Sequence, residues 1–189
     1  MSTQCEATGE GKRPQGRLSR FLRNRDGSTA VEFTLLSIPF AALVFAILES
    51  CISFAGQQVM ANVTDDIARQ IRTGQLRPAT LDEEALKGII CDRLEIIVAE
   101  GCPGLEVDLR EFTTFAQAAE VRIELTADRD LDTSDFDVDP GPSMSKNMLR
   151  VFYKWPVMTD FMSKLASNLK DGNTLHFATV TWQNEPFDD

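Results

Sequence analysis

One long apolar stretch near the N-terminus dominates the hydrophobic pattern of the chain. From Phe33 to Leu48 no side chain is charged, and apolar residues continue past Glu49 to Gly56. A helix rises ~1.5 Å per residue, so the ~24 residues from 33 to 56 would extend ~36 Å, enough to cross a hydrocarbon core of ~30 Å. The pattern predicts a single transmembrane helix, which we assign to residues 28–56.

Two other interpretations of this stretch are disfavoured. A buried helix of a soluble protein usually keeps a polar stripe at helical spacing, whereas Thr34 and Ser37 are the only polar residues between Phe33 and Leu48 and form no stripe. A secretory signal peptide usually has a shorter apolar core, of ~7 to 15 residues, followed by a small-residue cleavage site. We therefore expect an anchor that is not cleaved on its far side.

The segment before the anchor, residues 1–27, is basic. Its cationic residues outnumber its three acids and are Lys12, Arg13, Arg17, Arg20, Arg23 and Arg25. Basic residues that flank an anchor stay on the cytoplasmic side. We therefore expect a cytoplasmic leader and an external head, residues 57–189, which in a bacterium lies in the periplasm.

The net charge of the whole chain is −10, although the leader is basic. The head is therefore more acidic than this total suggests. Nucleic-acid binding requires a positive surface, so the charge excludes nucleic acid as a partner of the head. About 130 residues are enough for one domain with its own core.

An acidic residue lies at the near edge of the apolar stretch, in the segment Gly27-Ser28-Thr29-Ala30-Val31-Glu32. A charge in mid-bilayer costs ~2.5 to 3.5 kcal/mol on insertion scales, so intramembrane carboxylates are candidates for a function. A simpler interpretation is that Glu32 marks the start of the helix, where the positive end of the dipole favours an acid.

The basic leader, the Gly27 to Glu32 segment and the apolar helix together resemble the processing site of type IV prepilins. The longer sequence R-D-G-S-T-A-V-E-F is similar to the TadE-like pseudopilins of tight-adherence (Tad, Flp-type) pilus systems. The resemblance implies that a membrane-embedded prepilin peptidase cuts between Gly27 and Ser28. Glycine there leaves the backbone accessible, and Glu32 would pair with the free amine of a neighbouring subunit's Ser28, where low dielectric strengthens the ion pair.

The helix is expected to continue beyond the membrane. Apolar residues recur at three- and four-residue spacing at Val59, Met60, Val63, Ile67, Ala68 and Ile71. This amphipathic pattern predicts a continuation over residues 57–73, with Gly74 as the terminating residue and one helix of ~45 residues from Ser28. A second helix is predicted from Leu81 or Asp82 to about Gly101, with Thr80 as N-cap and Glu83 completing a capping box.

From Gly104 onward the apolar period changes to two, which is typical of half-buried strands. The predicted strands are Leu105–Leu109, Val121–Leu125, Leu149–Trp155 and Leu175–Trp182. A short helix is predicted between the last two, at Val157–Leu169, with Pro156 in its first turn. These elements predict an α+β fold. The resemblance implies a pilin-like lollipop, in which a long N-terminal transmembrane and stalk helix packs on a small antiparallel-sheet head.

Two pieces near the C-terminus extend the resemblance, Trp155-Pro156 and Asn184 to Phe187. Each is weak alone, and we expect both to have structural roles, as strand ends and core residues.

Cys91 and Cys102 are predicted to form a disulfide, because the space outside an inner membrane is oxidising. The closed loop of ~10 residues would contribute roughly 2 to 3 kcal/mol in the chain-entropy model. Free thiols and a zinc site are the alternatives, although the spacing fits no common zinc motif. Cys5 and Cys51 lie in the leader and the anchor, so neither is expected to pair with them.

An acidic segment from Asp128 to Asp139 is a weak candidate for a calcium site. Asp128, Asp130 and Asp132 match ligand positions one, three and five of an EF-hand loop, and Asp139 falls at the twelfth. Thr133 stands where the loop needs glycine, and the bidentate glutamate and flanking helices are lacking. A solvated acidic loop is the favoured interpretation, and no metal is assigned.

The sequence gives no indication of catalysis. It contains no nucleotide-binding loop, serine elbow or HExxH motif, and the single histidine, His176, is expected to be a core or surface residue of a strand. We therefore predict no enzyme activity and no cofactor.

The predicted function is that of a minor pilin-like subunit for assembly of an adhesive tight-adherence pilus. The implied partners are the prepilin peptidase, the major and other minor pilins, and the pilus assembly platform. The predicted location is the bacterial inner membrane, crossed once, with later incorporation in or at the tip of a pilus. The alternative is a permanently anchored periplasmic binding or sensor domain that responds to calcium.

Overall fold

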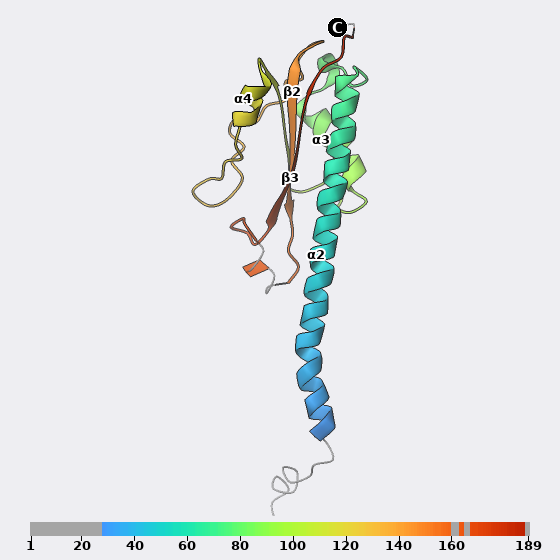
Figure 1. Ribbon diagram of the computed structural model, residues 1–189, viewed down its shortest axis with the longest axis vertical. Helices are drawn as coiled ribbons and strands as arrows, with labels where there is room; N and C mark the ends of the chain where they lie inside the picture. Colours follow the sequence, from blue (N-terminus) through green and yellow to red (C-terminus); the bar gives the residue numbers. More distant parts are fainter. Residues whose placement is uncertain (1–27, 160–162, 165–166, 188–189) are drawn as a thin grey trace, which may run out of the picture. The chain divides into compact units, whose positions relative to one another are not determined.

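The computed structural model describes the chain except for residues 1–27, 160–162, 165–166 and 188–189 (Figure 1). The elements in chain order are α2 (Ser28–Arg72), η1 (Pro78–Thr80), α3 (Glu83–Leu94), β1 (Leu105–Phe112), α4 (Phe115–Glu120), β2 (Lys146–Trp155) and β3 (Thr174–Gln183). The chain divides into two units, Met1–Val44 and Phe45–Asp189. The sheet and the C-terminal half of α2 belong to the second unit.

Helix α2 has the predicted length of 45 residues and the predicted start at Ser28. It ends where Gly74 adopts a φ of 71°, a conformation that glycine reaches without a Cβ penalty. The N–H of Gly74 donates to the carbonyl of Ile71, and the N–H of Gln75 donates to the carbonyl of Gln70. These two bonds form a Schellman motif, which confirms Gly74 as the terminating residue.

The sheet contains three antiparallel strands in the order β1-β2-β3. In the register of the sheet, Tyr153 on β2 lies opposite Leu105 on β1 and opposite His176 on β3. Alternate side chains from all three strands point to one face and pack with α2 and α3 in the main core. The strand residues of this core are Leu105, Val107, Leu109, Leu149, Val151, Tyr153, Trp155, Ala178 and Trp182.

The helices cover this face of the sheet with residues at helical spacing. From α2 they are Met60, Ile67, Ala68 and Ile71, and from α3 they are Leu86, Ile90 and Leu94. These positions fulfil the amphipathic pattern seen in the sequence. The result is an α+β arrangement of the pilin type, in which a long N-terminal helix packs against a small antiparallel sheet.

The predicted strand at Val121–Leu125 is wrong. Its only bridge joins Leu125 to Leu131, and the preceding residues instead form α4. Thr114 and Gln117 begin α4 with a capping box, which the sequence analysis overlooked. The edge of β1 that does not pair with β2 instead binds the segment at residues 137–139. The N–H of Leu109 donates to the carbonyl of Asp137, and the carbonyl of Leu109 accepts from the N–H of Asp139.

Two helix boundaries also differ from the predictions. The N-cap of α3 is Asp82, whose Oδ1 accepts from the N–H of Ala85 at 2.8 Å, whereas Thr80 lies in η1. Helix α3 ends at Leu94, well before the predicted end near Gly101.

The predicted helix at Val157–Leu169 starts too early, because residues 157–158 are not helical. Ser163 and Lys164 are helical. Residues 160–162 and 165–166 of that prediction lie outside the described part of the chain.

Candidate functional site: the apolar helix and its junction with the head

The first half of α2 exposes almost all of its large apolar side chains. Between 59% and 73% of the side-chain surface is exposed at Val31, Phe33, Leu35, Leu36, Ile38, Phe40 and Leu43. None of the most apolar part of this helix is buried by the rest of the described chain. By length and composition this segment can cross a membrane once.

The two hydroxyl side chains in this segment are satisfied within the helix. Thr34 Oγ1 donates to the carbonyl of Ala30 at 2.8 Å, and Ser37 Oγ donates to the carbonyl of Thr34 at 3.0 Å. Both groups can therefore enter hydrocarbon without losing a hydrogen bond to water. The helix also continues without a break through Pro39.

The residues of the predicted processing site lie at the start of α2. Gly27 lies outside the described residues, and Ser28 is the first residue of the helix. Glu32 is exposed one turn further on. Positions 28 and 32 are four residues apart, so they lie on the same side of the helix, separated by ~6 Å along its axis. The roles of Gly27, Ser28 and Glu32 stay predictions.

Further along α2, Glu49 joins the helix to the connection between β2 and β3. One carboxylate oxygen, Oε1, accepts from the backbone N–H of Met158 at 2.5 Å and of Thr159 at 3.3 Å. The other oxygen, Oε2, accepts from Thr159 Oγ1 at 2.6 Å. The carboxylate that interrupts the apolar stretch is therefore bound by the head.

One and two turns beyond Glu49, Ser53 and Gly56 face the ends of β2 and β3. Ser53 Oγ lies 3.0 Å from Nε2 of His176, and the ring of Trp155 packs against Gly56. Residues 49–56, predicted as part of the membrane span, are thus partly covered by the head.

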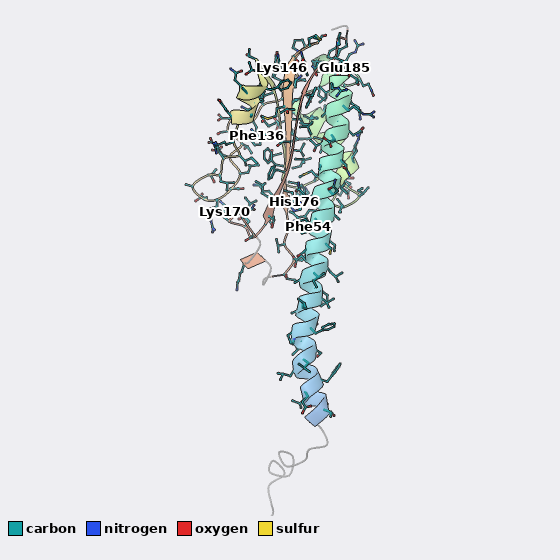
Figure 2. All side chains as sticks on the ribbon, viewed as in Figure 1. Phe54, Phe136, Lys146, Lys170, His176 and Glu185 are labelled. Carbon is teal, nitrogen blue, oxygen red and sulfur yellow. A yellow bond between two sulfur atoms is a disulfide. The ribbon has the colours of Figure 1, made fainter. Side chains whose placement is uncertain are left out.

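His176 is a buried residue of β3, which fits the prediction of a core or surface position in a strand. Its side chain is 7% exposed, and its ring stacks on Trp155 with centroids 5.0 Å apart and an interplanar angle of 15°. Burial lowers the pKa of His176 below its ordinary value, so the neutral ring is favoured. Figure 2 places His176 and Phe54 at the same end of the head.

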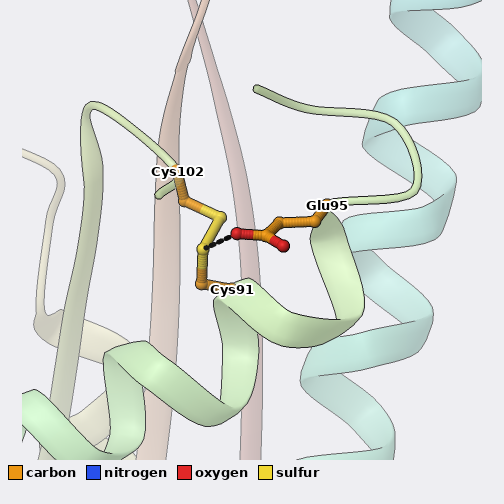
Figure 3. A group of neighbouring side chains, drawn as sticks. All are labelled: Cys91, Glu95 and Cys102. Carbon is orange, nitrogen blue, oxygen red and sulfur yellow. Dashed lines mark hydrogen bonds between the residues drawn. A yellow bond between two sulfur atoms is a disulfide. The ribbon is translucent and has the colours of Figure 1, made fainter. Parts of the chain in front are cut away.

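The predicted disulfide between Cys91 and Cys102 is present, with Cα atoms 5.7 Å apart (Figure 3). It joins the last turn of α3 to the residues before β1. Glu95 lies beside it, with Oε1 3.5 Å from Cys91 Sγ, and accepts from the N–H of Gly101 at 3.0 Å. Among the described residues, these two cysteines and Glu95 form the only group of three potential metal ligands within 4.8 Å of one another. Oxidised sulfurs provide no thiolate, so this trio is a poor zinc site.

The carboxylates of the acidic segment from Asp128 to Asp139 do not converge on one point among the described residues. Asp130 binds Lys154 Nζ at 2.7 Å, which lowers the pKa of that carboxyl group. Asp132 accepts from the N–H and the hydroxyl of Ser134, and these bonds lower its pKa. Asp128 and Asp139 complete no ligand group with them among the described residues. The calcium site stays an untested prediction, without a converging ligand set.

The outer face of the sheet holds a buried ion pair that the sequence analysis missed. Arg150 is 4% exposed and Asp108 is fully buried, with Nη2 and Oδ2 2.7 Å apart. The guanidinium lies beside the stacked rings of Phe136 and Phe152, at 5.4 and 5.5 Å from their centroids. Charges that alternate with apolar residues along a strand usually face solvent, so the sequence pattern gave no signal for this pair.

The C-terminal residues attach the end of the chain to both α2 and the loop before β2. Asn184 donates to the carbonyls of Gly141 and Pro142, and its Oδ1 accepts from the indole N–H of Trp182. Glu185 binds Arg72 at 2.9 Å. These contacts agree with the structural role predicted for residues 184–187.

The arrangement offers a membrane-compatible helix and a braced head. A family model described as TadE-like protein matches residues 27–69, which cover the predicted cleavage position and nearly all of α2. No curated protein and no solved structure matches the chain. Residues 27–69 of the chain are therefore similar to the TadE-like protein family.

Proposed function

We propose that this chain is a minor pilin-like subunit, processed by a prepilin peptidase between Gly27 and Ser28 and required to assemble an adhesive Tad pilus. The observation that carries the proposal is the exposed apolar surface of α2, which begins at Ser28 inside the TadE-like match. A soluble helix would bury such a surface, so the segment requires lipid or other apolar helices around it.

Glu32 provides the assembly contact in this proposal. Cleavage after Gly27 creates a free amine at Ser28, one turn from Glu32 in the same helix. In a bundle of pilin helices the carboxylate of one subunit pairs with the amine of the next, and low dielectric strengthens that pair. Because a carboxylate left without a counter-charge in lipid is costly, pairing favours subunits in register.

The orientation follows from the leader and the disulfide. The basic residues of segment 1–27 stay in the cytoplasm, which places the head in the periplasm. The Cys91–Cys102 disulfide supports the same side, because such bonds persist in oxidising compartments. In this position the head meets other pilins and the outer parts of the assembly platform.

Intact mass of the protein purified from membranes tests the processing step. We expect loss of Met1 to Gly27 in cells that make the pilus system, and full length for Gly27→Ala. A native protein of full length would contradict the proposal and favour a permanently anchored sensor domain.

The role of Glu32 is tested by a matched pair of substitutions. Glu32→Gln keeps the size but removes the charge, whereas Glu32→Asp keeps the charge. We expect both variants to be cut, and only Glu32→Gln to lose incorporation into sheared pili or pilus-assembly complexes. Equal incorporation of both variants would exclude charge pairing at this position.

A further inference from the structure

The connection between β2 and β3 forms the end of the head that meets Glu49. Its described residues are 156–159, 163–164 and 167–173. Figure 2 shows Phe54, His176 and Lys170 at this end of the head, and Lys146 and Glu185 at the opposite end. The surface at the first end is therefore adjacent to the apolar part of α2 within the same unit.

This surface exposes large apolar side chains. Met158 is 82% exposed, and on the neighbouring part of α2 Phe54 is 76% and Ile52 is 50% exposed. Met158 is held in place, because its backbone N–H donates to Glu49 Oε1 at 2.5 Å. The exposed methionine is thus fixed beside the helix that carries the apolar stretch.

The length of the apolar helix indicates which residue lies at the outer boundary of the hydrocarbon core. The 21 positions from 28 to 48 extend ~31 Å, which matches a hydrocarbon core of ~30 Å. Glu49 then lies at the outer boundary, where its three hydrogen bonds from residues 158 and 159 replace those it would make with water. Ile52 and Phe54 follow ~5 to 8 Å further along the axis, which is the level of the headgroups.

We propose that the head rests on the outer surface of the bilayer through Met158, whose side chain enters the headgroup and acyl boundary beside Glu49. The occupant of this surface is lipid, because exposed apolar side chains of α2 are present on both sides of the head-bound Glu49, from Phe45 to Leu48 and at Ile52 and Phe54. The proposal rests on the membrane anchor of the proposed function and places the hydrocarbon boundary at Leu48 and Glu49, short of the predicted end at Gly56.

Photo-crosslinking to lipid tests this contact in the full chain. A diazirine amino acid is placed singly at position 158, 144 or 43, and each protein is reconstituted in nanodiscs of phosphatidylethanolamine and phosphatidylglycerol. Met144 is the matched control, since it is a methionine, is 53% exposed, and precedes β2 whereas Met158 follows it. Leu43 reports on the anchor. Lipid adducts are identified by mass spectrometry.

We expect lipid adducts at positions 158 and 43, and about tenfold fewer at 144, because side chains beyond the interface do not reach the acyl chains. Adducts at 43 without adducts at 158 would overturn the surface contact and leave the anchor in place. Crosslinks from 158 to a second copy of the chain, or equal labelling at 158 and 144, would also overturn it. An absence of adducts at 43 would instead refute the membrane anchor on which the proposal rests.

Discussion

The indole ring of Trp155 lies against the backbone of Gly56, so closely that a Cβ on Gly56 would stand 2.7 Å from ring carbon Cη2. The contact joins the end of β2 to the middle of α2. It explains a glycine in the interior of a long helix, where alanine would be intrinsically more stable by ~1 kcal/mol.

Gly56→Ala is therefore expected to destabilise the head, although alanine favours the helix. Crowding in a packed site typically costs ~1 to 3 kcal/mol, which outweighs the helix propensity. Gly88→Ala is the matched control, because Gly88 lies in α3 with no atom within 4 Å of its Cβ position, and it should stabilise by roughly 0.5 to 1 kcal/mol. Thermal unfolding of both variants decides the point. Equal shifts of the same sign would contradict the close contact.

The sequence predicts those features of the helix and of its contact with the head that depend on neighbouring residues. It does not predict contacts between residues that are far apart in the chain. The length of α2 and its end at Gly74 were predictable, because helical spacing and a terminating glycine are properties of neighbouring residues. Glu49 and Thr159 are 110 residues apart, and no short-range pattern connects them. The strand predicted at Val121–Leu125 failed for the same reason, since alternation indicates two faces but cannot indicate whether a sheet edge is free.

The stability of the head should fall as the pH is lowered from about 7 to about 5. His176 has a folded-state pKa below its unfolded value of about 6.5, so its contribution is present above that pH and is lost as the pH falls through the folded pKa. The chain has one histidine, which isolates the effect in this range. His176→Gln should flatten the melting temperature between these pH values. An unchanged slope in the variant would assign the loss to carboxylates.

Removal of the disulfide should lower the stability of the head without abolishing its fold. The double substitution Cys91→Ala and Cys102→Ala releases a short loop, and the chain-entropy model gives a loss of about 3 kcal/mol. Cys51→Ala is the control, because this thiol is free and exposed, and it should leave the melting temperature unchanged. The measurement is denaturant unfolding, with and without reductant. Reductant should lower the stability of the native protein and leave the double variant unaffected.

Asp108→Ala should be the most destabilising single substitution on the outer face of the sheet. It leaves Arg150 buried without its counter-charge, and breaking a buried pair typically costs ~3 to 5 kcal/mol. Glu185→Ala breaks the half-exposed pair with Arg72, where solvent screens the charges, and should cost less than about 1 kcal/mol.

The double variant Asp108→Leu and Arg150→Met separates the two causes of that loss, since it removes both charges and keeps apolar volume. If the uncompensated charge is responsible, denaturant unfolding of the double variant should recover most of the stability lost in Asp108→Ala. If the double variant is as unstable as the single one, the hydrogen bonds that Asp108 accepts from Asp137 N–H and Arg110 hold the face together, and the ion pair is secondary.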